Sequence, residues 1–198
     1  GVGNKVVEVT NAFEKSWEFT EHTAKVNAVA VDKHKTDIKN WNIYSGGADN
    51  KVFKISPEGK KVWEFTLHTA AVNAIAVDDE GYVYSGGADC TLYKISPDGK
   101  KVWENKTNNE ITAIAIVSGD GVMVGTTGST LYTFEFDGTL GENEEIMYPG
   151  ENGKAVQDGN IVDIVVANDA SIFIVTKKEK MIYKMKYGEY KTSYKIIK

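Results

Sequence analysis

Short runs of apolar and alternating residues follow one another along the chain, and turn-forming residues separate them. Residues 72–77 (VNAIAV) are small and apolar, residues 81–85 (GYVYS) form a second run, residues 91–95 (TLYKI) alternate, and residues 101–104 (KVWE) form a fourth run. A period of two is typical of β-strands, and Asp-Asp-Glu-Gly or Pro-Asp-Gly between the runs favours tight turns. A sustained 3.6-residue helical period is absent from the sequence. The pattern therefore predicts an all-β protein.

This group of four runs recurs along the chain. Residues 14–55 and 60–95 share long identical blocks. The first copy is longer because it carries a six-residue insertion between Asp32 and Ile43. Four strands in a period of roughly 40 residues are typical of a β-propeller. We therefore predict an all-β single domain, a β-propeller of four-stranded antiparallel blades, with four complete blades and an N-terminal half blade. The expected blades span residues 4–20 (half), 24–66, 70–106, 110–150 and 159–198.

The half blade makes the strand count uneven. Residues 4–20 match residues 50–66 at a constant offset of 46, which corresponds to the second half of a repeat. The count of expected strands therefore overshoots four blades and falls short of five. Since propellers leave only short protected edges, we expect that this chain does not bury all its strand edges by itself. Upstream residues or another chain would then cover the open edge.

Polar residues return at the same places in the first two full repeats. The block Ser-Gly-Gly-Ala-Asp occurs twice, and a histidine lies upstream of each copy. On these residues the chain resembles the WD-repeat β-propeller family, in which Asp, His and Ser side chains form a buried hydrogen-bond network. The family's Trp is replaced by Ile55 or Ile95, and in the weaker third and fourth repeats Gly128 and Glu179 replace the Asp, while Asn108 or Asn109 replaces the His. The resemblance implies a structural network of Asp49, Asp89, His22, His68, Ser45 and Ser85.

Tryptophans recur once per repeat in the expected outer strand, at Trp17, Trp63 and Trp103. The segment that ends in Gly-Lys-Lys-Val-Trp also resembles the quinoprotein-like repeat, where a Trp docks on the neighbouring blade. We therefore expect these three side chains to pack blade against blade. Trp41 differs because it lies in the insertion with Ile38 near it, so this pair is a candidate partner contact. The alternative is that Trp41 folds back over its own blade.

Composition and charge narrow the possible functions. The net charge is −5 and the 23 basic residues are all lysine, which argues against nucleic-acid binding. The lone Cys90 aligns with Asn50, so we do not expect a catalytic nucleophile there. His22 and His68 belong to neighbouring blades, too far apart to share one metal ion. We therefore expect no catalytic residues, no cofactor and no metal, and the absence of arginine argues against a quinoprotein-like enzyme.

These observations favour a non-enzymatic scaffold that presents loops to a partner protein, with a structural place in a larger assembly such as a phage virion. The alternative is a glycan- or receptor-binding propeller. Acidic residues gather in residues 135–158 and lysines in residues 177–198, which favours self-association through complementary charge. Neither a membrane-spanning apolar run nor a signal peptide is visible, so we expect a cytoplasmic or virion-associated protein.

Overall fold

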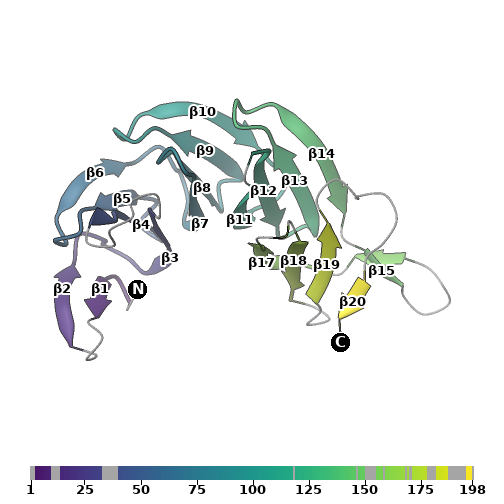
Figure 1. The fold of residues 1–198 in the computed structure, drawn as a ribbon, viewed down its shortest axis with the longest axis horizontal. Helices are drawn as coiled ribbons and strands as arrows, with labels where there is room; N and C mark the ends of the chain where they lie inside the picture. Colours follow the sequence, from purple (N-terminus) through teal and green to yellow (C-terminus); the bar gives the residue numbers. More distant parts are fainter. Residues whose placement is uncertain are drawn as a thin grey trace. The chain divides into compact units, whose positions relative to one another are not determined.

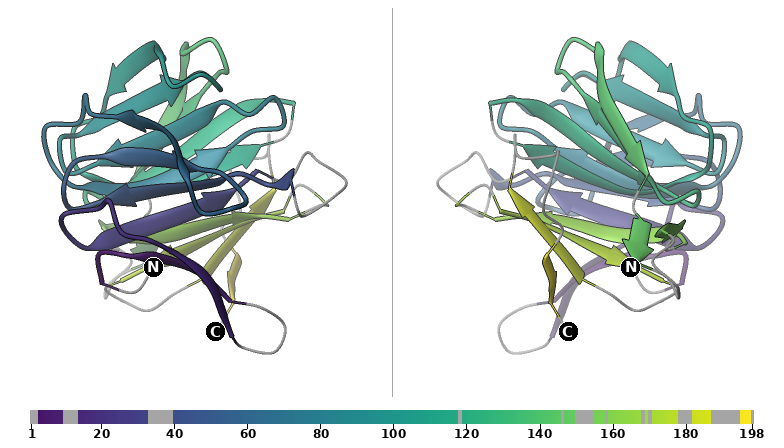
Figure 2. Two further views of the ribbon diagram at one scale, coloured as in Figure 1. Left: turned by 90° about the vertical axis from the view of Figure 1, so that its left-hand side faces the viewer. Right: turned by 90° about the vertical axis from the view of Figure 1, so that its right-hand side faces the viewer.

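The computed structural model contains two compact units, residues 1–106 (unit 1) and residues 107–198 (unit 2). The structure describes residues 3–9, 14–32, 40–117, 119–145, 147–149, 155–157, 159–167, 169, 171–177, 182–186 and 195–197. The elements that lie wholly within these ranges are all β-strands (Figures 1 and 2). Within the same ranges, no helix has the length and apolar character needed to cross a membrane.

Unit 1 contains a two-stranded sheet, β1–β2 (the half blade), and two four-stranded sheets, β3–β6 (the first full blade) and β7–β10 (the second full blade). Neighbouring strands in each sheet are antiparallel and follow chain order. The strands are β1 (Val6–Val9), β2 (Lys15–Phe19), β3 (Val26–Val31), β4 (Ile43–Gly47), β5 (Val52–Ile55), β6 (Lys61–Phe65), β7 (Val72–Val77), β8 (Val83–Gly87), β9 (Thr91–Ile95) and β10 (Lys101–Lys106).

Unit 2 contains two four-stranded sheets, β11–β14 and β17–β20, and the hairpin β15–β16 between them in sequence. The strands are β11 (Ile111–Val117), β12 (Gly121–Thr126), β13 (Thr130–Phe134), β14 (Leu140–Glu145), β15 (Met147–Pro149), β16 (Ala155–Gln157), β17 (Ile161–Val166), β18 (Ser171–Thr176), β19 (Ile182–Lys186) and β20 (Lys195–Ile197). The sequence did not predict the hairpin, because runs of three residues are too short to show a period of two.

The turns between strands form at the predicted positions. Gly81 has a φ of +84° and donates its N–H to Asp78 O at 3.1 Å, and Gly99 has a φ of +87°. These positive φ values favour glycine because it lacks a Cβ. Tyr82 also belongs to the first turn, since its N–H bonds to Asp78 Oδ1 at 2.8 Å. The second strand of this blade therefore begins at Val83, two residues later than predicted.

The sheets of unit 1 lie face to face (Figure 2), and glycines allow the close contact. A Cβ built on Gly46 of β4 would lie 2.5 Å from Val72 Cγ1 and 2.9 Å from Ile75 Cδ1 of β7. In unit 2, a Cβ on Gly125 would lie 2.4 Å from Ile161 Cγ2. Each complete interface within a unit therefore places a glycine of one blade's second strand under the first strand of the next blade.

Candidate functional site

Asp49, His22 and Ser45 form a chain of hydrogen bonds in the first full blade. His22 Nδ1 lies 2.9 Å from Asp49 Oδ2, and His22 Nε2 lies 2.9 Å from Ser45 Oγ. In the neutral ring, Nδ1 donates to the carboxylate, which can only accept, and Nε2 accepts from the serine hydroxyl. Asp49 also accepts from the backbone N–H groups of Thr23 and Lys51 at 2.9 and 3.3 Å. The network therefore ties the loop before β3 to β4 and to the turn that follows it.

The second full blade repeats this network. His68 Nδ1 lies 2.9 Å from Asp89 Oδ2 and His68 Nε2 lies 2.9 Å from Ser85 Oγ. Asp89 accepts from the N–H groups of Thr69 and Thr91 at 3.0 and 3.1 Å. Burial is the main cause that lowers the pKa of His68, while the neighbouring Asp89 acts in the opposite direction. The lowered pKa favours the neutral ring that this bonding pattern requires.

The same order of groups, Ser–His–Asp, also occurs in the catalytic triad of serine hydrolases. In that chemistry the serine oxygen must reach a substrate carbonyl, and nearby donors must stabilise the oxyanion. Ser45 and Ser85 are 0% exposed, and each lies in a strand that is paired on both edges. A buried hydroxyl of this kind has no access to substrate, so the arrangement is suited to holding the strand and its turn together.

The third repeat replaces the network with an asparagine. A Cβ built on Gly128 would lie 2.2 Å from Asn109 Nδ2, so the Asn109 amide occupies space that an aspartate at residue 128 would need. Asn108 instead donates its backbone N–H to Tyr132 Oη at 3.1 Å. Of the two asparagines proposed from the sequence, Asn109 therefore faces the turn. The fourth candidate position, Glu179, lies outside the described residues.

Two of the three recurring tryptophans dock on the turn of the next blade. Trp17 Nε1 donates to Pro57 O at 2.9 Å, and Trp63 Nε1 donates to Pro97 O at 3.0 Å. A Cβ at Gly59 would lie 2.6 Å from Trp17 Cδ2, so the glycine lets the ring lie directly on the turn. Each bond joins one sheet of unit 1 to its neighbour.

A buried tyrosine accompanies the tryptophan in each full blade of unit 1. The ring centroids of Tyr44 and Trp63 are 5.9 Å apart, as are those of Tyr84 and Trp103. The Tyr84 hydroxyl donates to Asp78 Oδ2 at 3.1 Å, whereas the buried Tyr44 hydroxyl has no hydrogen-bond partner among the described residues. Burial is the main cause that raises the pKa of both tyrosines.

A hollow of about 570 Å³ lies within unit 1, between the half blade and the first full blade. Trp41 is half-buried and contributes to its wall, while Ile38 lies outside the described residues. The hollow falls in the size range of ligand sites, which is about 300–1,000 Å³. The exposed side chains of Glu8 and Glu58 form its acidic rim. The apolar side chains that line it include Val6, Val7, Val9, Trp17, Val29, Val31, Trp41 and Ile43.

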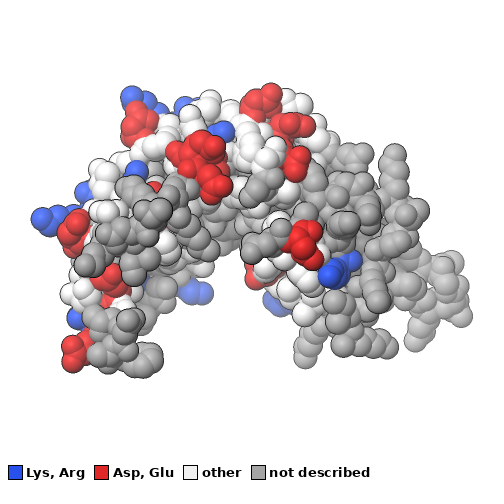
Figure 3. Space-filling model, viewed as in Figure 1, with Lys and Arg blue, Asp and Glu red and all other residues white. Residues whose placement is uncertain are grey.

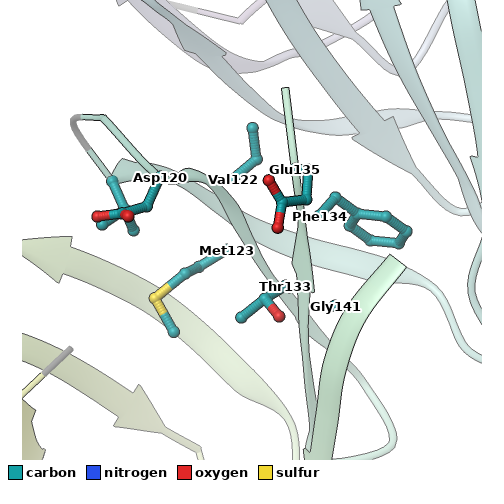
Figure 4. Close-up of a pocket in the computed structure, with 8 residues that line it drawn as sticks. Asp120, Val122, Met123, Thr133, Phe134, Glu135 and Gly141 are labelled. Atoms are coloured by element: carbon teal, nitrogen blue, oxygen red, sulfur yellow. The ribbon is translucent and has the colours of Figure 1, made fainter. Parts of the chain in front are cut away.

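Unit 2 has a much smaller pocket of about 30 Å³ beside the turn from β11 to β12 (Figure 4). Two carboxylates line it: Asp120 lies in that turn and Glu135 follows β13, with Met123 and Thr133 nearby. A space of this size admits about one or two water molecules. Within the described part of the chain, no group of three or more His, Cys, Asp or Glu side chains is placed to hold a metal ion.

Cys90 occupies a turn position that favours left-handed backbone. Its φ is +56°, and the equivalent residues Asn50 and Ser129 have φ values of +66° and +60°. Cys90 Sγ lies 4.0 Å from Ala88 O, a weak contact within the same turn. The equivalence with an asparagine and a serine indicates a turn-forming role for this residue.

Acidic and basic side chains lie close together on the outer strands of unit 1, and Figure 3 shows charges of both signs on one face of the molecule. Lys61 Nζ lies 3.1 Å from Glu64 Oε2, and Lys101 Nζ lies 2.9 Å from Glu104 Oε2. Exposed pairs of this kind contribute little to stability. The acidic segment 135–158 and the lysine-rich segment 177–198 lie largely outside the described side chains.

Three comparisons place these features among known proteins. A family model described as the outer membrane protein assembly factor BamB matches residues 48–143. The designed protein Ika4 has a TM-score of 0.67 and 19% identity, over 86% of this chain and 96% of Ika4. The WD40 β-propeller domain of Doa1 has a TM-score of 0.75 and 13% identity, over 91% of this chain and 57% of that one. No curated protein matches the sequence. The structural matches confirm the predicted β-propeller fold.

Proposed function

We propose that this chain, a WD-like β-propeller with quinoprotein-like repeat features, is a non-enzymatic module that binds a partner protein. The observation that carries the proposal is the burial of the only Ser–His–Asp arrangements found among the described residues. Their serine hydroxyls are 0% exposed, and their aspartates are already used by backbone N–H groups of the turns. These polar groups stabilise the blades, and blades stabilised in this way can present a surface to a partner.

The hollow supports a binding role because it is a large concavity with a mostly apolar lining. Val29 and Val9 are 42% and 54% exposed there, and Trp41 adds an aromatic side chain from outside the repeat. Aromatic and aliphatic side chains with a polar rim are typical of the centre of protein interfaces. The proposal also includes a place in a larger assembly such as a virion, and a cytoplasmic or virion-associated location. Both of these parts are suggested by the sequence alone.

Labelling with a fluorophosphonate probe tests the non-enzymatic role. We expect no modification of Ser45 or Ser85 in the folded protein, because the probe cannot reach a buried hydroxyl. The matched controls are Ser45→Ala and Ser85→Ala, together with a serine esterase as the positive control. Specific labelling of either serine, with turnover of an ester that the alanine variant lacks, would contradict the proposal. Saturable binding on a glycan array would favour the lectin-like alternative instead.

A further inference from the structure

The two blade interfaces of unit 1 differ by one pair of strands. β1 and β2 are equivalent to β5 and β6 at the offset of 46 residues. In the first full blade, β5 pairs with β6 on one edge and with β4 on the other. In the half blade, β1 pairs with β2, and its second edge has no strand partner among the described residues. An unpaired edge offers a row of backbone N–H and C=O groups for pairing.

The hollow lies where the missing second strand would contribute its side chains. Tyr44 of β4 packs on Trp63, but no equivalent tyrosine is present to cover Trp17 within the described part of unit 1. Gly46 of β4 lies under Ile75, whereas the equivalent of Ile75, Val29, is 42% exposed in the hollow. The side chains left uncovered are therefore those that β4 covers in the complete interface.

The charge at the rim indicates which kind of strand would fit. In the first full blade, Lys54 Nζ donates to Pro97 O at 3.1 Å and lies 5.6 Å from the Tyr44 ring centroid. In the half blade the equivalent residue is Glu8, whose carboxylate cannot donate to the equivalent carbonyl of Pro57. A carboxylate thus replaces a cation at this place, and Glu58 adds a second negative charge to the same rim.

This reversal argues against a further copy of the repeat as the occupant. In the second full blade, Asp78 lies close enough to Lys94 for the cation to lower the pKa of the carboxyl, although burial has the larger, opposite effect. A strand pair of the same type would bring such an aspartate towards Glu8. A second copy of the chain is also disfavoured, because its other described sheets have all four strands, apart from a hairpin of three-residue strands.

We propose that β1 and the hollow bind an extended segment of a partner protein by strand addition. The segment pairs with the open edge of β1, places an aromatic side chain on Trp17, and carries a lysine or arginine beside Glu8 and Glu58. Main-chain bonds supply affinity in this mode, while side-chain pockets supply selectivity. The inference rests on the proposed interaction role and assigns to it a site and a partner chemistry.

The test uses the full chain and a labelled peptide with the sequence of residues 42–48, in which Asn42 is replaced by lysine. In the first full blade, Tyr44 is the cross-strand partner of Lys54, so the peptide tyrosine would lie opposite Glu8 and its lysine at the diagonal position. Fluorescence anisotropy would report binding. We expect the Asn42→Lys peptide to bind more tightly than the Asn42→Asp peptide, and a Tyr44→Ala version of the lysine peptide to bind more weakly.

Protein variants locate the site. Val29→Asp should abolish peptide binding, whereas the control Val62→Asp, a similarly exposed valine outside the hollow, should leave it unchanged. Glu8→Lys should weaken binding of the lysine peptide about threefold to fivefold, whereas the exposed control Glu80→Lys should not. Circular dichroism would show whether each variant is folded. If Val29→Asp does not fold, Glu8→Lys still tests whether the peptide binds at this site.

Three results would overturn the inference: no binding of the lysine peptide, tighter binding of the aspartate peptide, or equal losses with Val29→Asp and Val62→Asp. A wild-type dimer in sedimentation velocity that Val29→Asp dissociates would also overturn it, since a second copy would then be the occupant. These failures differ from failure of the proposed function, which probe labelling and ester turnover would contradict.

Discussion

The interface between the half blade and the first full blade has the same apolar centre as the interface between the two full blades, and the two interfaces differ at the place of β4. Val6 and Phe19 pack on Val26 as Val52 and Phe65 pack on Val72. The valines at the centre are buried in both, at 6% and 0% exposure. The complete interface adds Tyr44, whereas the incomplete one contains the hollow. Two outer strands therefore suffice to bury the centre of the interface, and the inner strands decide whether a binding space remains.

Substitutions in the polar networks should not reveal this difference, because each network is formed by a full blade and the loop that leads into it. Asp49→Ala and Asp89→Ala should both destabilise the protein by about 2–3 kcal/mol, since each leaves a histidine and backbone N–H groups without their acceptor. Urea denaturation would measure both. A clearly smaller loss for Asp49→Ala would show that the first full blade depends on the missing strands for its internal order.

Substitution of the tryptophans should reveal the difference between the two interfaces. Trp17 and Trp63 make equivalent bonds to proline carbonyls, but within the described part of unit 1 only Trp63 also packs on a tyrosine. Trp63→Ala should therefore cost about 1 kcal/mol more in unfolding free energy than Trp17→Ala, which is the usual contribution of an aromatic pair. Equal losses in matched denaturation curves would indicate that Trp17 has an aromatic or equivalent partner, and that the two interfaces are alike.

The two buried tyrosines sharpen the comparison within the full blades. Tyr84→Phe should cost about 1 kcal/mol, because it removes the hydrogen bond to Asp78. Tyr44→Phe should be neutral or slightly stabilising, because the buried hydroxyl that it removes has no partner among the described residues. Thermal unfolding of both variants would measure the contrast, and equal destabilisation would mean that the Tyr44 hydroxyl is hydrogen-bonded in solution.

The smallest effect concerns pH. Burial lowers the pKa of His68 below its usual value of 6.5, so the unfolded chain binds a proton in a range where the folded chain does not. This contribution is nil at higher pH, and stability should fall as the pH drops below 6.5 towards the folded-state pKa. Urea midpoints between about pH 8 and pH 5 should fall more steeply for wild type than for His68→Gln. Parallel pH profiles for the wild type and His68→Gln would contradict the lowered pKa of His68.

Much of the frame could be predicted from the sequence because the repeats encode it twice. Identical blocks around Ser45 and Ser85 align the network residues, and turn glycines such as Gly99 mark the strand ends. The third repeat was ambiguous because Asn108 and Asn109 are adjacent, and only the side-chain positions separate them. The single domain and the open strand edges across the whole chain stay predictions.

The hollow could be predicted only in part. The offset of 46 residues revealed the half blade, and Trp41 stood out as an aromatic residue in an insertion. The sequence does not state which side chains a missing strand uncovers, since that depends on how β3 packs against the neighbouring sheet. The exposure of Val29 and the exchange of Lys54 for Glu8 acquire meaning only when the two interfaces are compared in three dimensions.

Native-state hydrogen exchange of the β1 and β5 amides tests the central claim most directly, because the two strands are equivalent and differ in whether the second edge is paired. The account predicts that the β1 amides on the edge away from β2 exchange much faster than the equivalent β5 amides in the free protein. It also predicts that the Asn42→Lys peptide slows exchange in β1 and leaves β5 unchanged. Equal protection of β1 and β5 without any peptide would contradict the account, because the edge of β1 would then already be paired.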